Sequence, residues 1–284
     1  MTWLIFILTS TLLYSIARLM QRILLKDEKS DAIAVSILFQ LSLGLFLFIF
    51  ALFFGNISFQ NFSKVLPNFI LLAFLYGLGN IFIFKALKYI DASSFAILYA
   101  GRVFVSVAAS SLFLREGLSL KQFLGMSLIV CAIIIIFYKK SLLHLNKGLI
   151  FTLLGALFFG LELTNDRAIL QSFSVYSYLF LCAFFPAIFA SFIYPSSLKN
   201  IVNLIKRDRL TKFILICLIY SVAMIFYFIA LQIGTNSSQI AVLDQLSTIV
   251  IVILGILVLK ESQHMLRKII AAIISVIGAI LLVV

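Results

Sequence analysis

Charged residues are scarce in this sequence. Asp, Glu, Lys and Arg make up only 11% of its 284 residues, whereas soluble domains carry roughly 25%. Hydrophobic residues account for 64%, and the mean hydropathy is +1.22. A chain with so little polar surface cannot cover a water-soluble globule. The composition therefore excludes a soluble protein and predicts one that is surrounded by lipid.

Residues that commonly bind metals or catalyse reactions are scarce as well. The two histidines, His144 and His264, lie in separate connections, so no metal site and no cofactor are predicted. The sequence has no Asp-rich cluster for metal-bound pyrophosphate, no histidine-centred base and no Walker A loop. We therefore expect neither an enzyme nor an ATP-driven pump. Disulfides are not expected either, because the three cysteines lie inside apolar runs.

Long apolar runs fill nearly the whole chain. A membrane-spanning helix needs about 20 mostly apolar residues. The runs are continuous and do not alternate with polar residues, which favours helices over a β-barrel. Ten spans are predicted, near residues 3–24, 32–54, 67–88, 93–114, 121–138, 148–168, 175–195, 212–232, 238–259 and 267–284.

The sequence also repeats itself after about 145 residues. Leu4-Ile5-Phe6 recurs as Leu149-Ile150-Phe151, and Phe113-Leu114-Arg115-Glu116 recurs as Val258-Leu259-Lys260-Glu261. An internal repeat in so apolar a chain is typical of transporters that are built from two similar halves.

Each repeat is expected to form one five-helix domain, over residues 1–140 and 146–284. Because five is an odd number, the second domain enters the membrane from the opposite side. The predicted fold is thus an all-α membrane protein with ten transmembrane helices in two inverted five-helix repeats. Since one chain contains both halves, a monomer is sufficient, and a homodimer is equally compatible with the sequence.

The net charge of +12 comes from lysines and arginines at the ends of the apolar runs. A nucleic-acid partner is not expected, because these residues do not cluster on one polar element. We call the membrane face on which the chain begins face A and the opposite one face B. Most of the lysines and arginines flank face B. The positive-inside rule therefore places face B in the cytoplasm and both chain ends outside. The expected location of the protein is the cell (plasma or inner) membrane.

Several segments in the two halves form a familiar pattern. In the first half they are ALKYIDASSFAILYA from Ala86, FLREGLSLKQFLG from Phe113 and IVCAIIII from Ile129. In the second half they are ALQIGTNSSQIA from Ala230, LKE from Leu259 and ISVIGAILL from Ile274. These segments resemble the EamA-type domains of the drug/metabolite transporter superfamily, and the resemblance covers essentially the whole chain as two domains.

This resemblance implies a ten-helix secondary transporter with a central cavity that moves small metabolites, often outward. It does not identify the substrate. Two features differ from the family pattern. Members often have proline early in the helix before the glutamate, where this chain has Gly101-Arg102-Val103 and Leu246-Ser247-Thr248. Members also commonly have both ends in the cytoplasm, contrary to the charge distribution here.

Four ionisable residues lie deep within apolar runs: Arg18, Arg102, Glu162 and Asp244. A charge at that depth costs about 2.5–3.5 kcal/mol, so these side chains should face a partner or a wet cavity. Arg102, Glu162 and Asp244 come to similar depths and are expected to converge, whereas Arg18 lies nearer face B and could extend toward it.

We expect these residues to bind substrate. Arg102 would bind an anionic group through its planar guanidinium, and Glu162 or Asp244 would bind a cationic group or a proton. Tyr99 and Gln245 are added because each lies within one turn of an intramembrane charge. The alternative for each charged residue is a structural arginine–carboxylate pair between helices.

The sequence thus predicts a secondary transporter, ion-coupled or exchanging, of a small polar metabolite, with an amino-acid exporter as one example. Its partners would be a small-molecule substrate and the lipid bilayer, and the buried carboxylates leave proton coupling open. A lipid-linked sugar flippase and a passive channel are the alternatives.

Two local interactions are predicted at the helix ends. Ser119 and Gln122 have the spacing of a capping box that starts the fifth span. Glu116 and Glu261 end the fourth and ninth spans, and each is expected to accept from the free N–H groups of the helix that follows it.

Overall fold

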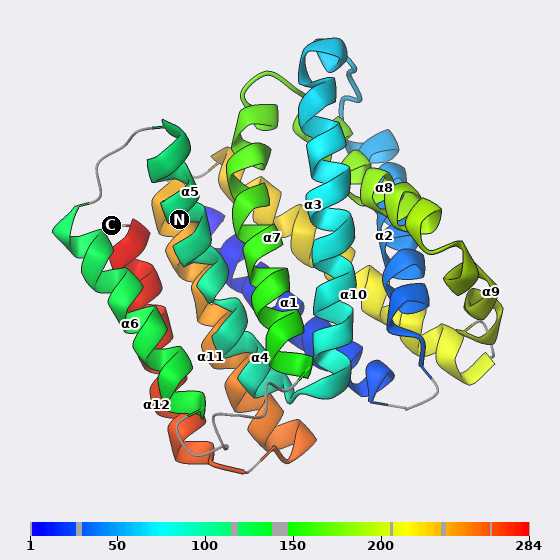
Figure 1. Cartoon of the computed structure of the whole chain (residues 1–284). Helices are drawn as coiled ribbons and strands as arrows, with labels where there is room; N and C mark the ends of the chain where they lie inside the picture. Colours follow the sequence, from blue (N-terminus) through cyan, green and yellow to red (C-terminus); the bar gives the residue numbers. More distant parts are fainter. Residues whose placement is uncertain are drawn as a thin grey trace.

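The computed structural model describes residues 2–26, 30–114, 119–137, 147–204, 207–233, 237–261 and 263–283. Within these ranges the regular elements are all helices (Figure 1). They are α1 (Thr2–Leu25), α2 (Ala32–Phe54), α3 (Phe62–Tyr89), α4 (Ala92–Tyr99), α5 (Gly101–Leu114), α6 (Leu120–Phe137), α7 (Lys147–Leu170), α8 (Val175–Ile193), α9 (Pro195–Leu204), α10 (Arg207–Ile233), α11 (Ser237–Leu259) and α12 (Met265–Val283).

The lengths of these helices confirm a multi-pass membrane protein. Eight helical segments are long and apolar enough to cross a bilayer, and two shorter apolar helices cover Leu120–Ile136 and Leu243–Leu259. Together they correspond to the ten predicted spans. Large apolar side chains such as Phe53 and Phe54 are 77% and 73% exposed, as expected for a surface that contacts lipid. The remaining helix, α9, lies in the basic connection between two spans.

The first helices of the two halves run in opposite directions. In the last turn of α1, Arg22 Nη1 donates to the carbonyl oxygen of Lys88 at 2.9 Å. In the first turn of α7, Gly148 lies so near the end of α3 that an added Cβ would be 2.1 Å from Ile90 Cγ2. The end of α1 and the start of α7 therefore meet at the same face, face B, as the inverted repeat requires.

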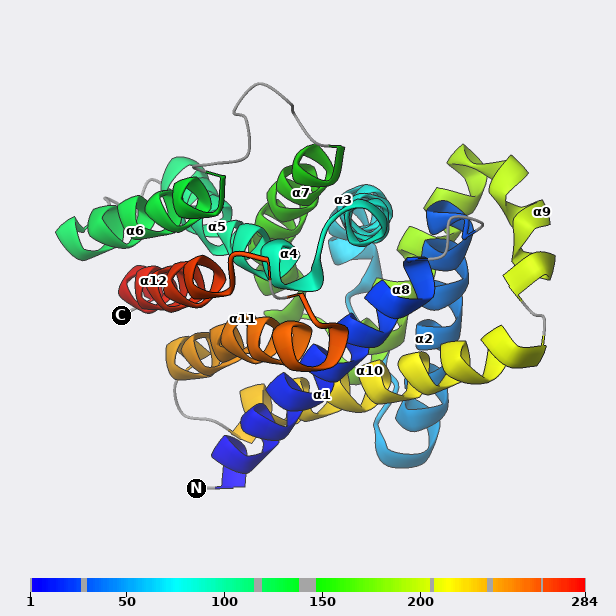
Figure 2. The ribbon, with the colours of Figure 1, turned by 90° about the horizontal axis from the view of Figure 1, so that it is seen from below.

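The two halves interleave around an approximate twofold axis. α3 packs along α7, and its counterpart α10 packs along α1. The pairs that this symmetry maps onto themselves also pack together, namely α2 with α8, α6 with α12 and α4 with α11. Figure 2 shows α6 beside α12 and α1 beside α10. Helices of each half thus pack against helices of the other, and the centre of the protein contains side chains from both halves.

The fourth predicted span is one apolar helical segment over Ala92–Ala109, with a tightened turn in its middle that the sequence did not predict. α4 ends at Tyr99 and α5 begins at Gly101, with Ala100 between them. Ala100 has helical dihedral angles (φ −57°, ψ −22°), its N–H donates to Ala96 O, and the Val103 N–H donates to Ala100 O, both at 3.1 Å. The chain therefore continues across the membrane with one tighter turn between Tyr99 and Arg102.

The predicted helix-end interactions are partly confirmed. The Ser119 N–H donates to Gln122 Oε1 at 2.9 Å, and the Gln122 N–H donates to Ser119 Oγ at 3.2 Å, which completes the capping box. The interpretation of Glu261 was wrong, because its carboxylate accepts from the Ala92 and Ser93 N–H groups at 2.9 and 3.0 Å. It therefore caps α4 of the other half. Glu116 lies outside the described residues.

The reason for the difference at Glu261 is tertiary. The packing of α11 against α4 brings the end of one helix to the start of the other at face B. The Ser93 hydroxyl also donates to the Glu261 carboxylate, and Lys268 of α12 pairs with Asp91 at 3.2 Å. The donors to the Glu261 carboxylate thus belong to α4 in the other half of the chain and not to α12, the next helix in sequence.

Candidate functional site

The intramembrane charges form two groups in the structure. The arginine cluster consists of Tyr14, Arg18, Tyr99, Arg102, Tyr220 and Asp244. The carboxylate cluster consists of Asn68, Tyr76, Glu162, Asn165, Asp166 and Tyr178. Each combines side chains from both halves of the chain.

Arg102 of α5 and Asp244 of α11 are direct partners. Arg102 Nη2 donates to Asp244 Oδ2 at 3.0 Å, and the two side chains remain 15% and 19% exposed. The Arg102 guanidinium also lies 4.7 Å from the centre of the Tyr99 ring, within the range of a cation–π contact. The pair neutralises both charges while leaving part of each side chain accessible.

Arg18 of α1 lies inside the protein and does not extend to face B. It is only 3% exposed. Its Nη1 donates to Gln21 Oε1 at 2.9 Å and its Nη2 donates to the Tyr14 hydroxyl. Among the described side chains, no carboxylate forms an ion pair with it. Four aromatic rings surround the guanidinium at 4.9–5.9 Å, those of Tyr14, Phe95, Tyr99 and Tyr220.

Among the residues that the structure describes, three buried polar groups in this region have no hydrogen-bond partner: Arg18 Nε, Gln21 Nε2 and the Tyr99 hydroxyl. Buried polar groups are nearly always satisfied, and exceptions often mark functional sites. A small cavity of about 10 Å³ lies beside Tyr99, with room for about one water molecule, whereas Arg18 and Gln21 do not line it. Its lining residues are Tyr14, Phe95, Ala96, Tyr99, Ala100, Arg102, Gln245, Ser247, Thr248 and Ile251. Tyr99 and Gln245 are thus at the cavity.

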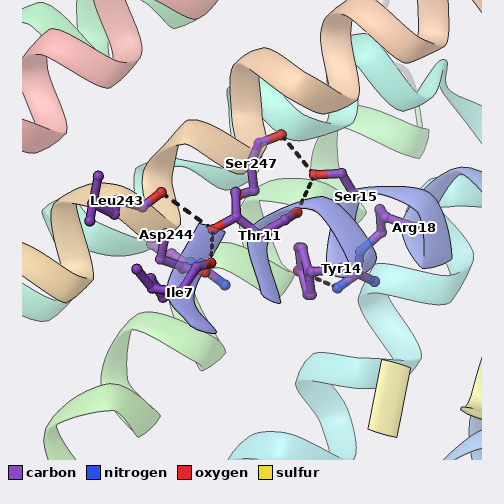
Figure 3. Close-up of polar contacts among 9 residues, drawn as sticks. Ile7, Thr11, Tyr14, Ser15, Arg18, Leu243, Asp244 and Ser247 are labelled. Atoms are coloured by element: carbon purple, nitrogen blue, oxygen red, sulfur yellow. Dashed lines mark hydrogen bonds and ion pairs between the residues drawn. The ribbon is translucent and has the colours of Figure 1, made fainter. Parts of the chain in front are cut away.

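Hydroxyl groups hold α1 against α11 at the arginine cluster (Figure 3). Thr11 Oγ1 donates to Leu243 O at 3.4 Å, and Ser15 Oγ donates to Ser247 O at 3.5 Å. Both hydroxyls also make shorter bonds within α1, to Ile7 O at 2.8 Å and to Thr11 O at 2.7 Å. The contacts between the helices are consequently long and weak.

Close contact between α7 and α5 positions Arg102 from the other side. A Cβ added to Gly160 would lie 2.5 Å from Val105 Cβ and 2.6 Å from Arg102 O. Since real Cβ atoms do not approach so closely, only glycine lets the backbone of α7 reach the backbone of α5 there.

Glu162 belongs to the carboxylate cluster and does not meet Arg102. It is 0% exposed, and its Oε1 accepts from Asn165 Nδ2 at 2.9 Å. Its Oε2 has no hydrogen-bond partner within the described part of the chain. The expected convergence of Arg102, Glu162 and Asp244 is therefore found for Arg102 and Asp244, while Glu162 turns to polar residues of α3 and α7.

Asp166 was missed by sequence reasoning. One turn beyond Glu162 on α7, its Oδ2 accepts from the Tyr76 hydroxyl at 2.6 Å, and its Oδ1 accepts from the Tyr178 hydroxyl. It lies near the end of an apolar run, whereas the residues singled out from the sequence lie deep within the runs. The spacing of four residues from Glu162 was the available signal, because it places both carboxylates on one helix face.

Aromatic contacts join the two clusters. The Tyr76 and Phe159 ring centres are 4.8 Å apart, and those of Phe159 and Tyr99 are 5.7 Å apart. The hydroxyl of Tyr76 belongs to the carboxylate cluster, whereas the ring of Tyr99 contacts both arginines. Packed rings thus lie in continuous contact between the two clusters.

Comparison with known proteins gives one family match in each half of the chain. The model of the EamA-like transporter family matches residues 1–138 and again residues 146–284. No curated protein matches the chain.

Proposed function

The chain belongs to the EamA-like transporter family, and we propose that it is a secondary transporter whose arginine cluster binds a small zwitterionic metabolite of the amino-acid class. The family supports membrane transport of a small molecule. The observation that supports this substrate class is Arg18, a buried cation with no carboxylate partner among the described side chains, beside the neutralised Arg102–Asp244 pair.

The carboxylate of the substrate would supply the missing counter-ion. A buried charge without a partner costs several kcal/mol, and a bound anion removes that cost. Guanidinium groups bind carboxylates through two parallel hydrogen bonds. Arg18 and Arg102 both contact the Tyr99 ring, so one carboxylate placed there can be shared between them. The unpartnered Tyr99 hydroxyl and Gln21 Nε2 are further donors.

Asp244 would hold the amino group. Of its two carboxylate oxygens, Oδ2 accepts from Arg102, which leaves Oδ1 able to accept from an ammonium group. Gln245 and Ser247 line the same cavity and offer neutral polar contacts. A substrate with a carboxylate and an ammonium group would therefore find opposite charges at matching places.

The cavity must enlarge before any metabolite binds, because it now holds about one water molecule. The inverted halves provide the means, since rocking of one half against the other opens the same site to each face in turn. The long hydroxyl contacts between α1 and α11 are interactions that such a motion would break at little cost. Coupling to an ion gradient or exchange with a second solute would drive the cycle.

The same proposal includes the orientation of the protein. The distribution of lysine and arginine favours face B in the cytoplasm and both chain ends outside the cell membrane. One chain contains the complete site, so a monomer is sufficient for transport. Labelling of single cysteines introduced at Gln60 and Lys199 tests the orientation: an impermeant thiol reagent added to whole cells should label position 60 and spare position 199.

The binding site is tested by a thermal-shift screen of the purified protein against amino acids, nucleotides and nucleotide sugars. Ligand at about 100 times its Kd stabilises the folded state by about 2.7 kcal/mol. A zwitterionic amino acid should raise the melting temperature of wild type and of Arg267→Gln, which removes an arginine outside both clusters. It should not do so for Arg18→Gln. An unchanged shift in folded Arg18→Gln would refute the assignment.

Counterflow in proteoliposomes then separates a carrier from the alternatives. A carrier preloaded with unlabelled substrate accumulates labelled substrate transiently, whereas a passive channel does not. A lipid-linked sugar flippase would instead respond to sugar-carrying lipids and ignore free amino acids.

A further inference from the structure

Glu162 and Asp166 form a pair of buried carboxylates that the substrate site does not use. They lie four residues apart, one turn along the same face of α7. Three of their four oxygens accept hydrogen bonds, from Asn165 to Glu162 and from Tyr76 and Tyr178 to Asp166. The fourth oxygen, Glu162 Oε2, is fully buried and lacks a donor among the side chains that the structure describes.

The surroundings of the pair contain no compensating cation within the part of the chain whose side chains are described. α3 contributes Tyr76, and α8 contributes Tyr178 and Cys182. α4 contributes Tyr99, whose ring contacts Phe159 of α7. α5 also packs on α7, but the guanidinium of Arg102 is bonded to Asp244. Two neighbouring carboxylates in such a site cannot both remain ionised.

One hydrogen atom resolves both the missing donor and the excess charge. Placed on Glu162 Oε2, it makes an O–H group that can donate to the Asp166 carboxylate. All four oxygens are then satisfied, and the net charge of the pair falls from −2 to −1. The remaining charge on Asp166 is stabilised by the hydroxyl groups of Tyr76 and Tyr178.

We propose that the Glu162–Asp166 pair binds one exchangeable proton and that this proton is the coupling ion of the transporter. The binding of the proton is independent of the substrate, whereas its role in coupling rests on the function proposed above. Asp166 lies one turn from the end of α7 at Leu170, so the proton exchanges with water at face A. Loss of the proton leaves two charges that cannot stay buried, which favours separation of α7 from α3 and α8. The ring contacts from Tyr76 through Phe159 to Tyr99 transmit this movement to the arginine cluster.

Infrared spectroscopy of the purified protein in lipid nanodiscs tests the proton directly and needs no substrate. Wild type should show the carbonyl absorption of a buried protonated carboxyl group, and Glu162→Gln should lack it. Asp166→Asn provides a second variant if Glu162→Gln does not fold: it keeps the Glu162 carboxyl group but replaces the carboxylate that accepts from it, so the band should shift in frequency. Asp91→Asn removes a carboxylate at face B that pairs with Lys268, and it should retain the absorption. A wild-type spectrum without this band, or a band unchanged in both folded variants, would overturn the proposal.

Transport in proteoliposomes tests the coupling. Exchange of one proton for each substrate supports accumulation of about tenfold per unit of pH difference. In Glu162→Gln the amide acts as a permanently protonated side chain. This variant should lose accumulation driven by the pH gradient and keep counterflow. Accumulation that follows a sodium gradient and ignores pH would exclude the proton as coupling ion.

The two proposals can fail separately. Arg18→Gln should abolish the thermal shift produced by substrate and retain the infrared band. If the band is present while no amino acid binds, the arginine cluster has been misassigned and the proton site stands. If substrate binds normally and the band is absent, the proton site has been misassigned and the arginine cluster stands as the substrate site.

Discussion

The arginine cluster and the carboxylate cluster occupy corresponding places in the two halves of the chain. In the first, α1 meets α10, and in the second, α7 meets α3. Tyr220 on α10 and Tyr76 on α3 are equivalent residues, because they are separated by the same 144 positions as Ala86 and Ala230. Tyr220 lies over the cation Arg18, whereas Tyr76 donates to the anion Asp166. Equivalent helix pairs, each with an equivalent tyrosine, thus surround charges of opposite sign in the two halves.

A second comparison concerns how closely the helices approach. Ser15 and Ser247 in one interface correspond to Gly160 and Arg102 in the other, each after a shift of 145. Ser15 reaches the carbonyl of residue 247 through its hydroxyl at 3.5 Å, whereas at Gly160 the α7 backbone itself is in contact with the carbonyl of residue 102. The duplicated backbone therefore sets the contacts, and individual substitutions give each half its own chemistry and spacing.

Removal of Asp244 should have the largest effect on the arginine cluster. Asp244→Ala leaves the Arg102 guanidinium without its carboxylate, close to Arg18, which pairs with no carboxylate among the described side chains. We expect a loss of about 3–5 kcal/mol in the free energy of unfolding. Chemical unfolding in detergent micelles measures this loss. A loss under about 1 kcal/mol would contradict the picture of a buried, interacting pair.

The double variant Arg102→Met/Asp244→Leu distinguishes a structural pair from a functional one. Apolar residues of similar volume can replace a buried pair at little cost or even with a gain in stability. We expect a free energy of unfolding within about 1 kcal/mol of the wild-type value but no counterflow. Normal counterflow in this variant would assign the pair to helix packing alone.

The two equivalent tyrosines offer a matched test of the opposite charges. Tyr76→Phe removes a hydrogen bond to a buried carboxylate, which should cost about 1.5–3 kcal/mol. Tyr220→Phe keeps the aromatic ring over Arg18 and should cost less than about 1 kcal/mol. Unfolding of both variants under the same conditions gives the comparison. Equal losses would mean that the two clusters do not differ as described.

The sequence predicted those features that local pattern and counting determine. The repeat and the ten spans gave the inverted fold, and depth along each span brought Arg102 and Asp244 to the same level. The interaction partners of individual side chains were harder to predict from the sequence. Glu162 was expected near Arg102 from its depth alone, but the face of α7 that bears it turns toward α3 and α8. Depth is a one-dimensional quantity, and the rotation of a helix about its axis depends on all its neighbours.

The tightened turn at Ala100 and the capping of α4 by Glu261 were missed for related reasons. No proline marks the turn, and the apolar run is indeed one helical segment. The partner of Glu261 lies in the other half of the chain, about 170 residues away, and only the interleaving of α4 with α11 reveals it. Such contacts belong to the tertiary structure and have no signature in a single sequence.

Glycine substitutions test the spacing between α7 and α5. Gly160→Ala places a Cβ against Val105 and Arg102 O, and we expect a loss of about 1–3 kcal/mol together with weaker substrate binding. Gly101→Ala is the control, because the nearest atom to its Cβ would be 3.8 Å away. The melting temperatures of the two variants, measured with and without substrate, give the comparison. Equal tolerance of alanine at both positions would show that α7 need not approach α5 so closely.

Ser15→Ala should have the smallest effect on stability. Hydrogen bonds between membrane helices contribute about 0.6 kcal/mol on average, and the Ser15 hydroxyl already bonds within α1 at 2.7 Å. We therefore expect a change of about 0.6 kcal/mol or less in the free energy of unfolding, with substrate affinity retained. Since the long contact to Ser247 O is one that must break when α1 and α11 separate, counterflow should be as fast as in wild type or faster. A marked loss of stability, or slower counterflow, would show that this hydroxyl stabilises the open conformation instead of the closed one.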